Sequence, residues 1–127
     1  MHIVQQLFEV VSFSPGGESD WNRLRWLFAP CATVTHVKEK QYRVADVEQM
    51  LTEFKQQIDE GTVIEHHEKL LEHRIQRFEN LAHVWCSYEA EAVTLEGEFY
   101  WRGFHSIQLI REDSEWHILN LLWRDEE

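Results

Sequence analysis

The sequence contains little cysteine and little positive charge. Its two cysteines, Cys31 and Cys86, have no CxxC spacing, so we expect both to be reduced thiols in a cytoplasmic protein. Only 12 Lys and Arg residues oppose 23 Asp and Glu residues, and the net charge of -11 repels phosphate backbones and anionic lipid surfaces. We therefore expect no nucleic-acid partner.

Long apolar runs and the common catalytic motifs are missing as well. No segment approaches the roughly 20 apolar residues that span a bilayer, and Met1–Gln6 has no basic stretch of the kind that begins an export signal. We expect no membrane partner. There is no GxSxG elbow, P-loop or GxGxxG motif, so acyl hydrolysis and nucleotide or dinucleotide cofactors have no support from the sequence.

What the sequence does contain is enough apolar material for one core. Hydrophobic residues make up 43% of the 127 residues and six of them are tryptophan, which excludes a disordered chain. No linker or repeat divides the sequence. We expect a single domain over residues 1–127.

Apolar residues at helical spacing predict three helices in the first half of the chain, over Ile3–Val11, Trp21–Phe28 and Val44–Ile58. Ser19 or Asp20 can cap the second helix, and Pro30 would stop it. Asp46 and Gln49 have the spacing of a capping box for the third helix. A short strand is expected between these last two helices, over Ala32–Val37.

The second half of the chain resembles strands. Three segments are dense in aromatic and aliphatic residues and are separated by turn signals, which predicts an antiparallel meander over Leu81–Ala92, Phe99–Ile110 and Trp116–Trp123. Thr62–Glu79 is ambiguous, because its apolar spacing favours a helix while the neighbouring pattern favours a strand. Helices followed by strands indicate an α+β domain with the helices packed on one sheet face.

The segment Asp20–His36, with its Leu27-Phe28-Ala29 run and β-branched strand, resembles the nuclear transport factor 2-like superfamily. The resemblance continues through Gly103–Leu109 to Trp123. It implies a strongly curved mixed or antiparallel sheet, shaped as a cone, with the N-terminal helices on its concave face around a pocket. It also implies that Thr62–Glu79 is a strand. The superfamily includes ketosteroid isomerases, scytalone dehydratases and SnoaL-like polyketide cyclases.

The resemblance points to two histidines as catalytic candidates. His36 matches the general-base aspartate of ketosteroid isomerases, and His105 matches an acidic hydrogen-bond donor on a later strand. The tyrosine that those isomerases carry on the first helix has no counterpart, which argues against steroid isomerisation. Two imidazoles facing one cavity can share the roles of base and acid. The alternative is that each is a hydrogen-bonded strand residue without a catalytic role.

Four further residues are ligand-binding candidates. Glu89 and Arg102 lie in apolar strands and could hold a ligand carboxylate or orient a histidine, although an alternating strand can equally direct both to solvent. Tyr88 and Trp123 offer flat aromatic surface. The ligand that suits them is small and hydrophobic or aromatic.

The histidine-rich segment Glu65–His73 raises the question of a metal site. His67 and Glu68 are not followed by the second histidine of an HExxH motif, and in a strand His66 points away from His67. We expect no metal there and interpret the segment as an exposed, charged strand or edge.

Two functions remain open from the sequence. One is a cofactor-free isomerase, dehydratase or cyclase that uses histidine acid–base chemistry, and the other is a non-catalytic module for ligand binding or assembly. A homodimer is expected in either case. The superfamily commonly pairs through the outer sheet face, and aromatic side chains of the last strands need cover, namely Trp85, Trp101, Trp116 and Trp123.

Overall fold

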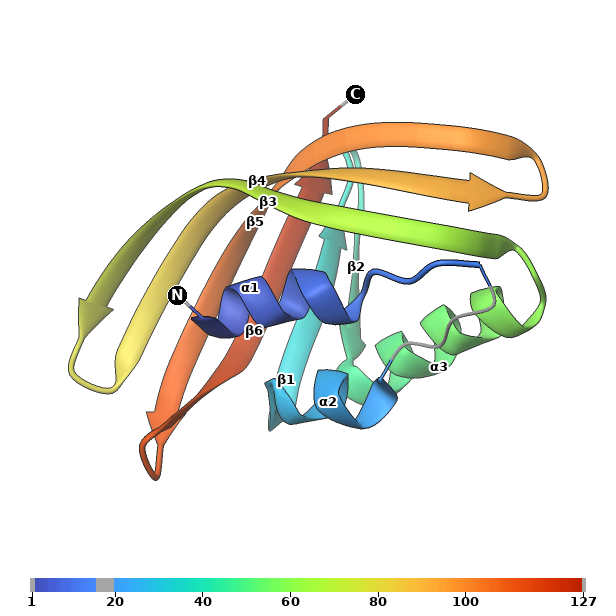
Figure 1. The fold of residues 1–127 in the computed structure, drawn as a ribbon. Coiled ribbons are helices and arrows are strands. Elements are labelled where there is room, and N and C mark those ends of the chain that lie inside the picture. Colours follow the sequence, from blue (N-terminus) through green and yellow to red (C-terminus); the bar gives the residue numbers. More distant parts are fainter. Residues whose placement is uncertain (1, 16–19, 127) are drawn as a thin grey trace.

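A strongly curved sheet arches over the N-terminal helix in the computed structural model, which describes residues 2–15 and 20–126 (Figure 1). The elements follow in the order α1 (His2–Val10), α2 (Trp21–Trp26), β1 (Phe28–Val37), β2 (Tyr42–Asp46), α3 (Val47–Asp59), β3 (Val63–Phe78), β4 (Leu81–Thr94), β5 (Gly97–Glu112) and β6 (Glu115–Asp125). Helix α1 lies across the concave face, and α3 lies at one end of the arch (Figure 1).

The six strands form one mixed sheet in the order β2-β1-β6-β5-β4-β3. Neighbouring strands are antiparallel except β1 and β6, which run parallel. The predicted meander is confirmed, because β4, β5 and β6 pair in sequence through tight turns. The α+β cone with helices on the concave face is therefore the observed architecture.

Strand β3 occupies the segment for which the sequence was ambiguous. It pairs with β4 from Val63 to Phe78, so the helical interpretation of its periodicity is wrong and the strand implied by the resemblance is correct. The pairing register shifts between Val63 and Glu65 and again between Leu70 and His73. Each shift changes which face the following side chains occupy, so the strict period of two is lost and the spacing imitates a helix.

The second helix is shorter than predicted. It ends at Trp26, and Phe28 already pairs with Ile118 of β6, whose backbone N–H donates to the Leu27 carbonyl at 2.7 Å. Pro30 therefore lies inside β1 and does not stop the helix. The pairing with β6 is irregular after Phe28, and a proline is tolerated at such a place because no ladder hydrogen bond is lost.

The helix starts follow the sequence closely. Asp20 caps α2, whereas the other candidate, Ser19, lies outside the described residues. The capping box of α3 is formed as expected, with the Gln49 N–H donating to Asp46 at 2.8 Å and the Gln49 side chain accepting from the Asp46 N–H at 2.9 Å. Val44, expected in this helix, lies instead in β2, which the sequence analysis missed.

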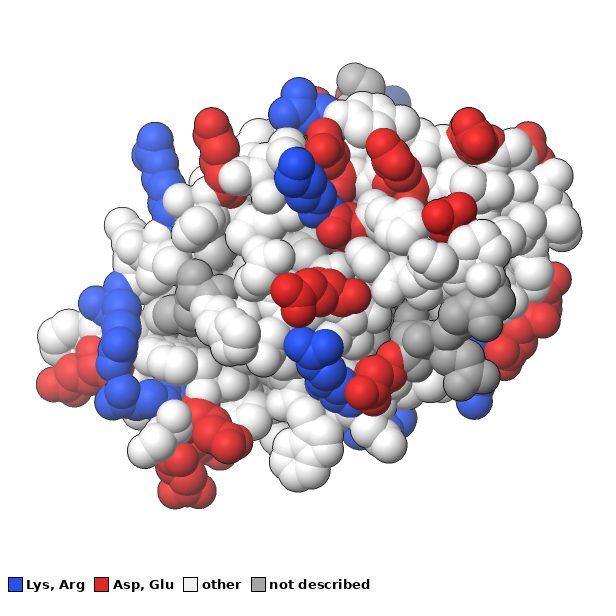
Figure 2. Space-filling view, viewed as in Figure 1, with Lys and Arg blue, Asp and Glu red and all other residues white. Residues whose placement is uncertain are grey.

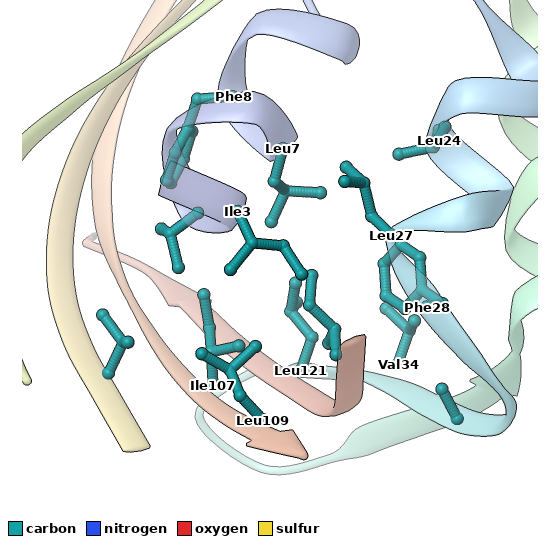
Figure 3. Close-up of a cluster of buried hydrophobic side chains, with 14 of the residues drawn as sticks. Ile3, Leu7, Phe8, Leu24, Leu27, Phe28, Val34, Ile107, Leu109 and Leu121 are labelled. Atoms are coloured by element: carbon teal, nitrogen blue, oxygen red, sulfur yellow. The ribbon is translucent and has the colours of Figure 1, made fainter. Parts of the chain in front are cut away.

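The core lies between the helices and the concave face of the sheet (Figure 3). Helix α1 directs Ile3, Leu7 and Phe8 toward Ile107 and Leu121 of the central strands (Figure 3). This burial holds α1 against the sheet, because apolar area removed from water stabilises the folded chain by roughly 25 cal/mol per Å². The central strands β5 and β6 are thereby fixed under the helix.

The surface carries mainly acidic charge. Asp and Glu side chains are spread over the face seen in Figure 2, with Lys and Arg interspersed. This agrees with the net charge of -11. Within the described residues, no helix is long and apolar enough to cross a membrane.

A glycine positions one side chain of the interior. Gly103 of β5 stands in register between Tyr88 of β4 and Asp125 of β6. The Tyr88 hydroxyl reaches over it and donates to Asp125 Oδ1. A Cβ at Gly103 would lie 2.5 Å from the Arg124 carbonyl oxygen and 2.9 Å from Tyr88 Cε1, so only glycine leaves room for this crossing.

We expect Gly103→Ala to destabilise the protein by about 1–3 kcal/mol, because the clash is with backbone as well as with the tyrosine ring. Urea unfolding measures the change. The control is Gln108→Ala on the same strand, an exposed site that should stay within about 0.5 kcal/mol of wild type. Equal stability of Gly103→Ala and wild type would contradict the steric argument.

Candidate functional site

Four register-matched positions on the concave face bring the candidate histidines into one row. Cys86 of β4 pairs with His105 of β5, His105 pairs with Trp123 of β6, and Trp123 pairs with His36 of β1. Residues in register share a sheet face, so both histidines point to the interior of the cone. Cys86 is fully buried there, and burial raises the pKa of its thiol to about 12.

Trp123 stands between the two histidines. Its ring is stacked on His36 with centroids 4.5 Å apart and an 8° angle, and on His105 at 6.2 Å and 26°. Both imidazoles thus lie on the concave face, but His105 is not among the residues that line the cavity beside His36. They do not form a contacting acid–base pair, because an indole separates them.

His36 is paired with a carboxylate. Its Nε2 lies 3.3 Å from Asp125 Oδ2, and the other Asp125 oxygen accepts the Tyr88 hydroxyl hydrogen bond. Burial raises the pKa of Tyr88, and the bond to Asp125 raises it further, so this phenol stays protonated. With Nε2–H directed at Asp125, the lone pair of the neutral His36 ring is on Nδ1.

A cavity of about 430 Å³ opens beside His36. Its walls come from β1, β2, β6 and α3, and Trp123 forms part of them. Apolar groups are contributed by Val34, Met50 and Phe54. The polar groups are Lys38, Gln41 and an ion pair between Arg43 and Glu53. The volume lies within the roughly 300–1,000 Å³ that small-molecule sites occupy.

His105 is buried deeper and has no polar partner. It is 7% exposed, and both of its ring nitrogens lack a hydrogen-bond partner among the described residues. Aromatic rings surround it, with Tyr88 at 4.6 Å and the edge of Phe8 at 5.4 Å between centroids. Burial lowers the pKa of His105 to about 4, although Glu68 and Asp125 act in the opposite direction. The ring is therefore neutral at neutral pH.

Glu89 and Arg102 lie on the opposite face of the sheet. They pair with each other in register, and each stands between residues that face the interior, so both point outward. Glu89 accepts a hydrogen bond from the Tyr100 hydroxyl at 2.9 Å. Of the two alternatives that the sequence left open for these charges, strand alternation favours the one that directs both side chains away from the cavity.

The interior contains a second histidine–carboxylate pair that the sequence analysis missed. His66 Nδ1 donates to the Val11 carbonyl at 2.9 Å, and its Nε2 lies 3.4 Å from Glu68 Oε1. Burial opposes charging of the ring, but the hydrogen bond and charge of Glu68, with the Val11 carbonyl, raise the pKa of His66 above its ordinary value. His66 is 8% exposed, so the interpretation of this stretch as an exposed strand is wrong for its inward face.

The missed carboxylates had a weak signal in the sequence. Glu68 follows His66 by two residues, which places the two on one face of a strand. Asp125 belongs to an acidic terminus that looks like a solvated end, and only pairing of β6 with β1 and β5 brings it to His36. No group of three or more metal-ligating side chains gathers within residues 2–15 and 20–126.

The buried His105 makes stability depend on pH. Its folded pKa of about 4 lies below the ordinary histidine pKa of 6.5, so between these pH values the unfolded chain binds a proton that the folded chain does not. We expect this group to remove roughly 3 kcal/mol of stability as pH falls from about 6.5 to 4. Urea unfolding of wild type and His105→Phe at several pH values measures this change. In the variant, the loss of stability between about pH 6.5 and 4 should be smaller by about this amount.

Histidine-resolved NMR provides the direct check. The His105 resonances, assigned from their loss in His105→Phe, should not shift between pH 8 and about pH 5. The His67→Gln variant, at an exposed site, is the control for losing any one imidazole. A His105 signal that titrates as a free imidazole would contradict the buried, neutral assignment.

The chain matches no protein-family model and no curated protein, but it does match solved structures. One is a nuclear transport factor 2-like superfamily protein from Salmonella enterica serovar Typhimurium, 15% identical with a TM-score of 0.76 over 96% of this chain and 84% of that chain. A second is a protein from Novosphingobium aromaticivorans described as a scytalone dehydratase, 9% identical with a TM-score of 0.79 over 99% and 80%.

A third similar structure is a type 2 hexachlorocyclohexane dehydrochlorinase, 10% identical with a TM-score of 0.78 over 98% of this chain and 81% of that chain. At such low identity the likeness concerns the backbone, and it does not transfer an activity. The chain therefore has the nuclear transport factor 2-like cone fold, which it shares with the structures described above.

Proposed function

We propose that this protein is a cofactor-free enzyme that transfers a proton on a small, partly hydrophobic molecule, with His36 as the base. The observation that carries the proposal is the pairing of His36 with Asp125 at the wall of the 430 Å³ cavity. A carboxylate behind an imidazole fixes its tautomer and stabilises the imidazolium that forms when the ring accepts a proton.

The chemistry that suits this arrangement is elimination or isomerisation. His36 takes a proton from a carbon made acidic by a neighbouring electron-withdrawing group. In an elimination the electron pair forms a double bond and expels a group from the next carbon, and the imidazolium then protonates that group. In an isomerisation the proton returns to a different carbon. The dehydratase and dehydrochlorinase names among the similar structures support elimination.

The neighbours of His36 assist in different ways. Tyr88 holds the second oxygen of Asp125, so the carboxylate keeps its orientation. Trp123 stacks on the His36 ring and so holds the imidazole in place at the cavity wall. His105 is neutral and is not among the residues that line this cavity, so it does not deliver a proton there.

We assign this activity to the cytoplasm. Cys31 is exposed and Cys86 is buried, and neither is in a disulfide. Unpaired cysteines suit a reducing compartment.

The test is proton exchange in D₂O on a panel of cyclic ketones, β-hydroxy ketones and β-chloro ketones, followed by NMR. We expect turnover of at least one class, and a fall in kcat/KM of about 10²–10⁴-fold for His36→Gln. Asp125→Asn should also lower kcat/KM. The matched control is His67→Gln, which removes an exposed histidine that also pairs with a carboxylate, Glu65 at 2.7 Å.

Unchanged turnover in His36→Gln would contradict the proposed base. Binding of panel members without exchange or elimination would favour the non-catalytic ligand-binding module instead. Tryptophan fluorescence reports that binding, because Trp123 lines the cavity.

A second observation favours assembly. Side chains from four strands form an exposed apolar band on the convex face, which we define as Val44, Trp85, Phe104 and Leu122. The rings of Trp85 and Phe104 are stacked with their centroids 5.4 Å apart. Val44 and Leu122 both pair in register with Thr35 of β1, one on each side of that strand. Of the tryptophans expected to need cover, Trp101, Trp116 and Trp123 pack on the core instead, and only Trp85 is in the band.

We propose that a second copy of the chain covers this band, burying on the order of 1,600 Å² in total. Sedimentation equilibrium should give a dimer for wild type and a monomer for Leu122→Glu, because a carboxylate at a two-fold apolar contact is repelled by its own copy. Thr52→Glu on the exposed side of α3 is the control and should stay dimeric. A wild-type monomer at high micromolar concentration would contradict the dimer.

A further inference from the structure

Helix α3 separates two cavities, and only one of them contains His36. The second has a volume of about 360 Å³ and lies between α3, the start of β3 and the β4–β5 hairpin. Phe54 and Gln57 of α3 line both cavities. In Figure 1, α3 lies under the end of the arch where β3 begins and β4 turns into β5. The two cavities are therefore neighbours on either side of one helix.

The second cavity is lined mainly by apolar groups. Ile58, Val63, Ala92, Phe99 and Trp101 form most of its wall. Its one titratable residue is His66, and both nitrogens of that ring are engaged, by the Val11 carbonyl and by Glu68. A ligand in this cavity meets no unpaired charge, so an uncharged, apolar group fits it best.

Phe54 lies at the boundary between the two cavities, because it lines both of them. Its ring contacts Trp21 at 5.5 Å, His66 at 5.9 Å and Phe13 at 6.3 Å between centroids, in each case edge to face. The three contacts fix the ring at this boundary, where it narrows the space that a ligand tail can occupy. A smaller side chain at this position would widen that space, and the combined volume of the two cavities would still lie within the roughly 300–1,000 Å³ range of ligand sites.

We propose that the second cavity receives the uncharged apolar tail of the substrate whose reactive end lies at His36, and that Phe54 limits the length of that tail. The inference rests on the proposed function, because the reactive end is placed by the His36 base. Lys38 and Gln41 of the first cavity suit a carbonyl-bearing head, whereas Arg43 is already paired with Glu53. The substrate class is thus a small carbonyl compound with an aliphatic or aromatic tail.

The probe is a homologous series of 2-alkanones, from 2-butanone to 2-dodecanone, titrated into wild type with backbone NMR shifts as readout. Affinity should rise about fourfold per methylene until the tail fills the second cavity. Short members should shift residues around His36 only, whereas long members should also shift Ala92 and Thr94. In Phe54→Ala the rise in affinity should continue to longer chains.

Two further variants isolate the effect. Val63→Trp fills the second cavity, so long ketones should lose affinity while 2-butanone binds as in wild type. Lys55→Ala on α3 is the control, since its exposed side chain belongs to neither wall, and its length dependence should match wild type. Wild type alone is sufficient for the shift map if a variant fails to fold.

The failures of the two proposals are distinguishable. Long and short ketones that bind equally and shift only residues near His36, or ketones that bind in neither cavity, overturn the tail site. Long ketones that shift Ala92 but do not compete with 2-butanone also overturn it, because the two cavities then hold separate molecules. Length-dependent binding without any proton exchange leaves the tail site in place and contradicts the enzyme.

Discussion

Tyr88 crosses one strand to reach its partner, and the candidate site depends on that crossing. The tyrosine of β4 passes over Gly103 of β5 and donates to Asp125 of β6, whose other oxygen faces His36 of β1. Four strands are thus tied together on the concave face. A side chain at Gly103 would meet backbone atoms and block this crossing. The orientation of Asp125 therefore depends on the strand register that brings Tyr88, Gly103 and Asp125 side by side.

The interior combines apolar packing with buried polar groups. Burying a polar group without a partner costs about 1–3 kcal/mol, and the cone meets this cost by pairing His66 with Glu68 and the Val11 carbonyl. His105 is the exception, since both nitrogens are buried without a partner within the described chain. Burial without a charged partner in contact keeps this ring neutral, because desolvation lowers its pKa.

Helix α3 links the fold to the site. Its capping box fixes where it begins, and its inward residues form a common wall for two cavities. The His36 cavity contains polar groups at its walls, whereas the cavity by His66 is mainly apolar. One short helix therefore sets both the chemical character and the size of the space beside the base. Its position follows from packing on β1 and β3, which lie far apart in the sequence.

The sequence by itself determined the capping box of α3 and the β4–β6 meander, because caps and turns act over a few residues. It could not determine the phase of β3, where register shifts break the period. Only the tertiary structure placed Glu89 and Arg102 outside and Asp125 beside His36. Strand pairing decides these contacts, and a parallel β1–β6 pair joins residues nearly ninety positions apart.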